Sequence, residues 1–418
     1  MKNKLMLLST LFLAGVLLLG TNGCKDDDPT TLSLVSLKAG SVDLNGAVAA
    51  TTVPTNPTIV AEFTTNVDPA TATSANITMT RDYDKANVVI TITTSANMVT
   101  IVPTEALASG ALYKLNFGAG IKSTDAQPLT AISRAFTTIG TFAPSGMVAY
   151  WNFEDNANDQ VGAFDAPASG IVDMSYTASR NAAAGKAATF NGTTSIIEIP
   201  NGNQLINTHD FTLNFWVKAA NSGKGHFIIG LAAFYGFQFE LGADFKYFKM
   251  PVQFDYGDGT SGTGGDLAYN GDGKTKDNGG WRGTTFNKEN TALDATLKEK
   301  WFHITYVYNS ASKERMFYLN GELVIKQDHD LFLNDLGETT KEMGIVGLKY
   351  AGIAPETVNE LAFGFVQSRA GTLWDGEGWG GYAFPGANHF QGQLDDVRIY
   401  HKALTAAEID LMYKSEKP

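Results

Sequence analysis

The chain has 418 residues, of which 11% are aromatic, 18% are charged and 43 are glycine, and its formal net charge is −12. It is therefore long enough for two hydrophobic cores and too apolar to remain disordered. Because an acidic chain is repelled by the phosphate backbone, the composition argues against nucleic acid as a partner.

The first 23 residues have the pattern of a secretory signal peptide. Lys2 and Lys4 precede an apolar run over residues 5–19, which is too short to span a bilayer comfortably. Cys24 follows directly and is the one cysteine of the sequence, so it has nothing in the chain to pair with in a disulfide. We therefore predict that Cys24 is lipidated.

The segment around Cys24 resembles a bacterial lipobox, with Thr21 in place of the usual aliphatic residue. Residues 25–28 (KDDD) resemble the acidic export tag that sends lipoproteins of Bacteroidetes-type bacteria to the outer face of the outer membrane. The alternative is a solvated charged linker. The resemblance implies an outer-membrane lipid anchor and a tether over residues 24–30, with the protein facing the cell exterior.

Residues 31–141 are predicted to form a first β-sandwich, because short β-rich runs alternate with Pro, Asp, Gly and Ser clusters. The runs cover residues 59–63, 76–80, 88–94, 98–103, 112–117 and 135–138. The words PTIVAEFTTNVDP and MVTIVPTEALASGALYKLNF resemble the bacterial Ig-like domains of surface-layer and carbohydrate-degrading proteins. In that family the module commonly acts as a spacer. We predict the same role here, because no cluster of His, Cys or carboxylates suggests more.

A second all-β domain is predicted over residues 146–418, after a short linker that contains Pro144. Residues 301–326 (WFHITYVYNSASKERMFYLNGELVIK) contain three runs of aromatic and β-branched residues, which favour strands. Asn320-Gly321 separates the last two runs and is typical of a type I′ hairpin turn. The segment therefore predicts a three-stranded antiparallel meander, whose apolar face requires a second sheet over it.

A Trp-x-His strand followed by a Tyr-x-Asn-Gly hairpin resembles the LamG-like, concanavalin A-like jelly-roll domains. The stretches YWNFEDNANDQVG, GKAATFNGTTSIIEIP and GQLDDVRIY occur in the family's order. The resemblance implies a fold class of two β-sandwiches, Ig-like and then jelly-roll, and leaves the ligand open because this superfold carries lectins, adhesion modules and enzymes. At the end of the chain, Thr405 and Glu408 have the spacing of a capping box, which predicts a short helix that docks through Ile409 and Met412.

Two glycine-rich inserts, around residues 255–290 and 371–388, carry aromatic residues that are candidates for ligand binding. The candidates are Trp281, Trp374, Trp379, Tyr256 and Tyr382. Rings on such loops either form a private mini-core under the loop or face a ligand. Because sugars stack their C–H faces on aromatic rings, we predict a glycan or polysaccharide ligand, with Asp and Asn residues of the same loops binding its hydroxyls.

A structural calcium ion is the second candidate feature, because Asp155, Asn156, Asn158 and Asp159 crowd one loop and hard oxygen ligands suit Ca²⁺. In LamG-like relatives a calcium ion often lies at a sandwich edge. The resemblance implies a ligand role for Asp155 or Asp159 more readily than for Asp395. One alternative is a turn held by Asx hydrogen bonds. For Asp395 and its neighbour Asp396, the alternatives are an ion pair with Arg398 and the capping of a neighbouring loop.

The sequence lacks the catalytic motifs of jelly-roll enzymes. Jelly-roll glycosidases place paired carboxylates on one strand face as Glu-x-Asp-x-x-Glu or a close variant, and no such word occurs. Glu240 with Asp244 is the nearest candidate pair, and the six histidines are scattered outside any known catalytic word. We predict a non-catalytic module and leave open a hydrolase or lyase with dispersed residues.

The function predicted from the sequence is carbohydrate binding by a surface lipoprotein. The resemblance to surface glycan-binding lipoproteins implies polysaccharide-uptake proteins as partners. Adhesion to a protein is the alternative, and exposed aromatic residues that form a flat patch rather than a cleft would favour it.

Overall fold

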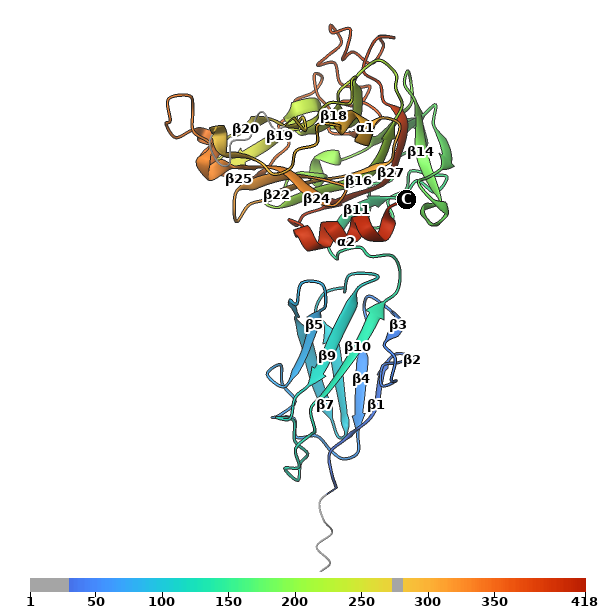
Figure 1. The fold of residues 1–418 in the computed structure, drawn as a ribbon, viewed down its shortest axis with the longest axis vertical. Coiled ribbons are helices and arrows are strands. Elements are labelled where there is room, and N and C mark those ends of the chain that lie inside the picture. The colour runs from blue at the N-terminus through green and yellow to red at the C-terminus, as the bar shows by residue number, and fades with distance from the viewer. Residues whose placement is uncertain (1–29, 273–280) are drawn as a thin grey trace, which may run out of the picture.

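The computed structural model describes residues 30–272 and 281–418, apart from the side chain of Trp281. Most of its regular structure is β-strand, arranged as two sandwiches in chain order (Figure 1). We call them the N-terminal sandwich, strands β1–β10, and the C-terminal sandwich, strands β11–β27. The predicted all-β fold class is confirmed. In the described part of the chain no helix is both long and apolar enough to cross a membrane.

The N-terminal sandwich packs two five-stranded sheets against each other. One has the order β2-β1-β4-β8-β7 and the other β3-β10-β9-β5-β6. Alternation explains the packing: in β8, Val99 and Ile101 point into the core while Met98 and Val102 face solvent. The strands are β1 (Leu34–Ala39), β2 (Val42–Asp43), β3 (Ala50–Val53), β4 (Ile59–Phe63), β5 (Ile77–Arg81), β6 (Asn87–Val88), β7 (Ile90–Ser95), β8 (Met98–Pro103), β9 (Leu112–Phe117) and β10 (Ile132–Thr138).

One layer of the C-terminal sandwich is a nine-stranded sheet with the order β13-β14-β27-β16-β22-β23-β24-β21, in which β11 also pairs with β27. Its strands are β11 (Met147–Trp151), β13 (Ser175–Ala178), β14 (Lys186–Asn191), β16 (Phe211–Ala219), β21 (Thr284–Phe286), β22 (Phe302–Asn309), β23 (Glu314–Leu319), β24 (Glu322–Asp328) and β27 (Gln391–Tyr400). A short helix, α1 (Leu293–Leu297), precedes β22.

The other layer is an eight-stranded sheet with the order β12-β15-β26-β17-β18-β19-β20, in which β25 also pairs with β19. Its strands are β12 (Ile171–Val172), β15 (Ile196–Ile199), β17 (His226–Leu231), β18 (Phe237–Leu241), β19 (Phe248–Tyr256), β20 (Ser261–Tyr269), β25 (Ile345–Leu348) and β26 (Leu361–Phe363). The main hydrophobic core lies between the two layers and includes Trp151 and Phe215, which are fully buried.

The predicted meander is confirmed as β22, β23 and β24, paired in antiparallel order. Asn320 and Gly321 have φ angles of 51° and 82°, as the positive φ values of a type I′ turn require. Alternate residues of β22, such as Phe302, Ile304 and Tyr306, are buried in the main core. The meander is thus part of the nine-stranded layer and is covered by the second sheet.

The predicted terminal helix is α2 (Ala406–Glu416), and its capping box between Thr405 and Glu408 is present. Figure 1 shows α2 between the two sandwiches, against the nine-stranded sheet. Ile409 and Met412 are buried in the same apolar cluster as the core of the N-terminal sandwich. The nine-stranded sheet therefore faces the N-terminal sandwich across α2. The eight-stranded sheet lies on the side turned away from the N-terminal sandwich (Figure 1).

Candidate functional site

The candidate site is a cleft of about 390 Å³ on the outer face of the eight-stranded sheet. Alternation along β18 creates its floor, because Phe237, Phe239 and Leu241 point into the core and leave Gln238 and Glu240 on the opposite face. The cleft is lined by Phe227, Phe234, Gln238, Glu240, Lys249, Pro251, Thr263, Gly265, Asp266, Trp374, Trp379 and Asn388.

Two tryptophans of the segment 371–388, which we call the insert, wall one side of the cleft. The ring centroids of Trp374 and Trp379 lie 4.9 Å apart. Each ring also packs edge-on against an aromatic residue of the floor, Trp374 on Phe234 at 5.9 Å and Trp379 on Phe227 at 6.1 Å. Trp379 remains 42% exposed. The rings are therefore held in place while one of them is open to a ligand.

The insert is fastened to the sheet at its base. Phe365 and Ala387 belong to a separate apolar cluster beneath it, and the ring of His389 stacks on Phe365 at 4.5 Å. The hydroxyl of Tyr382 donates to the carbonyl of Thr194. Gly381 allows the tight turn, because a Cβ there would lie 2.6 Å from the ring of Phe384. Packing under the insert thus gives its aromatic wall a fixed position.

A buried carboxylate pins the chain just before the insert. Glu198 of β15 accepts hydrogen bonds from the Ser368 hydroxyl at 2.9 Å, the Arg369 amide at 2.7 Å and Arg369 Nη2 at 2.6 Å. Burial alone would raise the pKa of Glu198, but the hydrogen bonds from Arg369 and Ser368 outweigh it and lower the pKa. The ionised carboxylate is therefore part of the folded geometry.

The polar floor is built around Lys249, which lies on β19 between β18 and β20. Glu240 lies directly opposite Lys249 in the β18–β19 register, with Oε2 3.6 Å from Nζ. Asp266 Oδ2 lies 2.9 Å from the same Nζ. Burial raises the pKa of Glu240 despite the lysine. Burial alone would lower the pKa of Lys249, but the hydrogen bond that Lys249 donates to Asp266 and the charge of Glu240 raise it.

Gln238 adds an unsatisfied acceptor to this floor. Gln238 is only 8% exposed, and its Nε2 donates a hydrogen bond to Glu240. Its Oε1 has no hydrogen-bond partner among residues 30–272 and 281–418. This oxygen is enclosed, so it is an unpaired acceptor beneath the surface of the floor and is not open to the cleft.

Arg315 supports the floor from inside the sandwich. It is fully buried on β23, and it donates to the carbonyls of Gly264 at 3.1 Å and Gly265 at 2.9 Å, directly before Asp266. Its Nε also donates to Gln327 at 2.8 Å. The guanidinium therefore ties the β20 backbone to the other sheet and sets the position of Asp266.

Sequence reasoning located the aromatic wall but only part of the candidate set. Trp374 and Trp379 come together at the cleft, whereas the ring of Tyr382 lies partly buried under the insert. The assignment of Tyr256 was wrong, because it is 5% exposed and belongs to the main core. The side chain of Trp281 lies outside the described residues.

Of the Asp and Asn residues in the two predicted inserts, Asp266 and Asn388 line the cleft, and Asp266 lies on strand β20. Sequence reasoning missed Gln238 and Lys249. The signal that could have found the first is the alternation of FQFEL in β18. Glu240 and Asp244, the nearest candidate pair of carboxylates in the sequence, do not share a strand face, because β18 ends at Leu241 and Asp244 accepts from the amide of Lys246 in a turn.

The residues predicted to bind calcium do not form one donor set. Asp159 accepts backbone N–H groups from Tyr150, Val161, Gly162 and Phe164, which is the turn alternative. Asp155 pairs with Lys186 at 2.6 Å, and Asn156 accepts from the amide of Asn158. The described residues hold no group of three His, Cys, Asp or Glu side chains suited to a metal ion. These residues as placed do not fit calcium.

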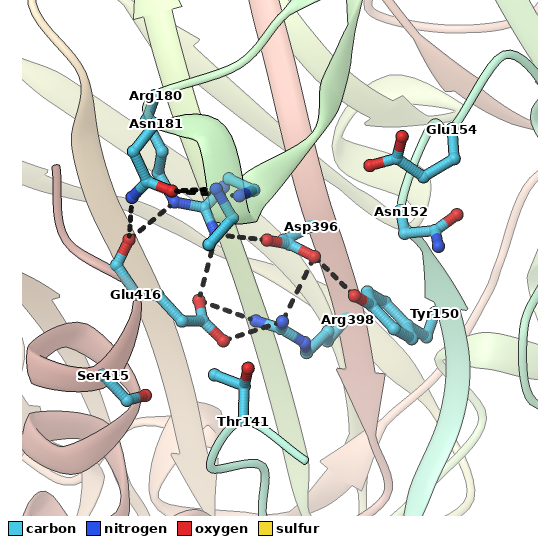
Figure 2. Close-up of a pocket in the computed structure, with 12 residues that line it drawn as sticks. Thr141, Tyr150, Asn152, Glu154, Arg180, Asn181, Asp396, Arg398, Ser415 and Glu416 are labelled. Atoms are coloured by element: carbon cyan, nitrogen blue, oxygen red, sulfur yellow. Dashed lines mark hydrogen bonds and ion pairs between the residues drawn. The ribbon is translucent and has the colours of Figure 1, made fainter.

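Asp395 belongs instead to a buried ion-pair network beside a second cavity of about 220 Å³. Figure 2 shows this cavity with Arg180, Asp396, Arg398 and Glu416 of the network. Arg180 contacts Asp395 at 2.6 Å and Asp396 at 2.5 Å, and Arg398 contacts Glu416 of α2 at 2.8 Å. Burial, together with the charge of Asp396, raises the pKa of Asp395 to about 8. Because these charges pair with one another, the network serves to clamp α2 to the nine-stranded sheet.

Comparison with known proteins identifies the first domain. Residues 42–138 match the family model of a bacterial Ig-like domain. The predicted Ig-like module is thereby confirmed for these residues, which lie within the N-terminal sandwich. No curated protein matches the chain.

The solved structures that resemble the chain include toxin domains. The receptor-binding domain of botulinum neurotoxin type G is 15% identical, with a TM-score of 0.36 over 65% of this chain and 51% of that one. The serotype D ligand-binding domain in complex with N-acetylneuraminic acid is also 15% identical, with a TM-score of 0.38 over 65% and 51%. The chain thus aligns with about half the length of these structures. Similarity at this level does not establish a shared ligand.

Proposed function

We propose that the protein is a non-catalytic glycan-binding lipoprotein and that the glycan lies in the cleft between the polar floor and the insert. The observation that carries the proposal is Trp379, an exposed ring fixed by two aromatic neighbours beside carboxylate and amide acceptors. The ring provides a stacking face for sugar C–H groups, and Glu240 and Asp266 provide acceptors for hydroxyls. A concave site with few convergent polar groups is typical of small-ligand binding.

The position of the cleft supports display at a cell surface. The described chain begins at the end of the N-terminal sandwich that lies farthest from the C-terminal sandwich (Figure 1). The cleft occupies the opposite end of the molecule, so the Ig-like module would hold it away from a membrane. The lipid anchor at Cys24 and its acidic tag lie outside the described residues and rest on the sequence pattern. Polysaccharide-uptake proteins of the same membrane are the proposed partners.

The finer fold assignment is also part of the proposal. We place the C-terminal sandwich with the LamG-like jelly rolls, supported by its two packed sheets and by the Asn320-Gly321 hairpin. Trp379 stands beside a cleft and not on a flat patch, which favours a glycan over the protein-adhesion alternative.

The test is a glycan array probed with residues 25–418, which retain every described residue, in calcium and in chelator. Selective binding to one group of polysaccharides is the expected result, with equal signals in both buffers because the residues predicted to bind calcium do not line the cleft. No binding across a broad array would contradict the proposal. A signal that disappears in chelator would restore the calcium hypothesis.

A polysaccharide hydrolase is the second candidate, favoured by one observation. Glu240 has a raised pKa, as a general acid needs, and Asp266 is a second carboxylate held by the same Lys249. Release of reducing ends from an array-positive polysaccharide distinguishes the two functions. We expect none, and a release that Glu240→Gln abolishes would replace binding with catalysis.

A further inference from the structure

The charge of the cleft indicates which class of glycan it accepts. We propose that the cleft selects uncharged glycans and rejects glycans that carry carboxylate or sulfate groups. This inference rests on the proposed glycan-binding function and adds the chemical class of the ligand.

The floor of the cleft contains two acidic side chains and one basic side chain. Among the described residues that line the cleft, Lys249 is the one cation, while Glu240 and Asp266 are both anions. Both carboxylates contact its Nζ, at 3.6 Å and 2.9 Å. The lysine is thus already neutralised by its neighbours, and the three groups together are negatively charged when ionised.

The insert strengthens this negative field. Between residues 371 and 388 the sequence contains Asp375 and Glu377 and has no Lys, Arg or His. Both acids are exposed close to Trp374 and Trp379 in the sequence. These acids add negative charge to the insert, although neither of them lines the cleft.

An anionic sugar would have to compete for Lys249 with carboxylates that are already in place. The Lys249 side chain is 26% exposed and that of Glu240 is 15% exposed, so these charges are only partly screened by water. A carboxylate of an anionic sugar would lie beside Glu240 and Asp266 and be repelled by their like charge. This repulsion weakens binding of the anionic sugar more than a new hydrogen bond to Lys249 strengthens it.

The hydrogen-bonding groups of the floor also suit hydroxyls. Glu240 and Asp266 present carboxylate oxygens, which accept hydrogen bonds when ionised. Sugar hydroxyls can donate to these oxygens, whereas a carboxylate or sulfate oxygen on the ligand cannot. The acceptor oxygens and the excess of negative charge therefore point to the same ligand class.

The experiment compares polymers that share a backbone and differ in charge. Hydroxyethylcellulose, laminarin and dextran are each paired with their carboxymethyl derivatives, and binding of residues 25–418 is measured by affinity electrophoresis. For any backbone that binds, we expect at least tenfold weaker binding of the carboxymethyl form. Raising the salt concentration should reduce that difference because it screens the repulsion.

Asp266→Asn is the informative variant, since that side chain is 41% exposed and its loss removes one negative charge with little change in volume. It should narrow the gap between neutral and carboxymethyl polymers. Asp244→Asn is the matched control, because Asp244 lies beyond the end of β18 and does not line the cleft. It should leave the gap unchanged.

Equal or tighter binding of the carboxymethyl form by the parent would overturn the inference while leaving glycan binding intact. An unchanged gap in Asp266→Asn would overturn the assignment of selectivity to this floor. Failure of every neutral and charged polymer to bind would count against the proposed function itself, and the inference would fall with it.

Discussion

Arg369 closes a bidentate contact on Glu198, with its amide 2.7 Å from Oε1 and its Nη2 2.6 Å from Oε2. Glu198 lies on β15, whereas Arg369 directly precedes the insert that carries Trp374 and Trp379. The contact therefore links the rigid sheet to the start of the aromatic wall. It is the polar counterpart of the apolar cluster under the insert.

Glu198→Gln should lower the free energy of unfolding by about 1–3 kcal/mol, the usual cost of disturbing hydrogen bonds to a buried charged group. It should also weaken glycan binding, because the wall loses its anchor. Chemical denaturation measures the unfolding free energy, and titration with an oligosaccharide that the parent binds measures the affinity. Asp410→Asn removes an exposed ion pair with Lys414 and is the control, expected to change neither.

The stability supplied by Glu198 should depend on pH in a defined direction. Its pKa in the folded protein is lowered from 4.5, so the folded state binds fewer protons than the unfolded state in the acidic range. The contribution is therefore complete above pH 4.5 and is lost as the pH falls through the folded pKa. The difference in unfolding free energy between the parent and Glu198→Gln should shrink on acidification. A difference that grows with acid would contradict this account.

Arg398→Met tests the clamp on α2. The substitution keeps much of the side-chain volume but leaves the buried carboxylates of Asp396 and Glu416 with less positive charge. We expect a loss of about 3–5 kcal/mol in unfolding free energy, because an uncompensated buried charge is costly. Lys414→Met, on the exposed side of the same helix, should cost less than about 1 kcal/mol. Equal costs for the two would show that the network is not a clamp.

Gly321→Ala tests the hairpin that the sequence predicted. Gly321 has a φ of 82°, and a Cβ there would lie 3.1 Å from the Tyr413 side chain of α2. We expect a loss of about 1–3 kcal/mol, the usual cost of a non-glycine residue in strained backbone. Gly344→Ala is the control, since its added Cβ meets nothing within 4 Å. Thermal or denaturant unfolding compares the two variants.

Local patterns in the sequence predicted the features that short segments determine. The Asn320-Gly321 turn and the Thr405–Glu408 capping box are each set by a few adjacent residues, and both are present. Most strands of the N-terminal sandwich were predicted for the same reason. Strands β1, β2 and β3 were missed. Strand β2 has only two residues, and β3 pairs with β10 from a distant part of the sequence.

The candidate site could not be assembled in the same way, because its parts meet through register and tertiary packing. Alternation within β18 places Glu240 on the outer face. Whether Lys249 lies opposite Glu240 depends on the register between β18 and β19, which alternation does not give. Trp379 reaches the cleft only because its insert folds back over β17. Tyr256 shows the converse error, since a ring within a glycine-rich stretch is a core residue at the end of β19.

The most direct test of the account is the affinity of Trp379→Ala, measured by isothermal titration beside Phe384→Ala. Both residues are exposed aromatics of the same insert, at 42% and 40%, but Trp379 lines the cleft and Phe384 does not. If the glycan stacks in the cleft, Trp379→Ala should weaken binding roughly tenfold or more, as loss of a central aromatic contact does, while Phe384→Ala binds like the parent. Equal affinities for both variants and the parent would show that the glycan binds elsewhere.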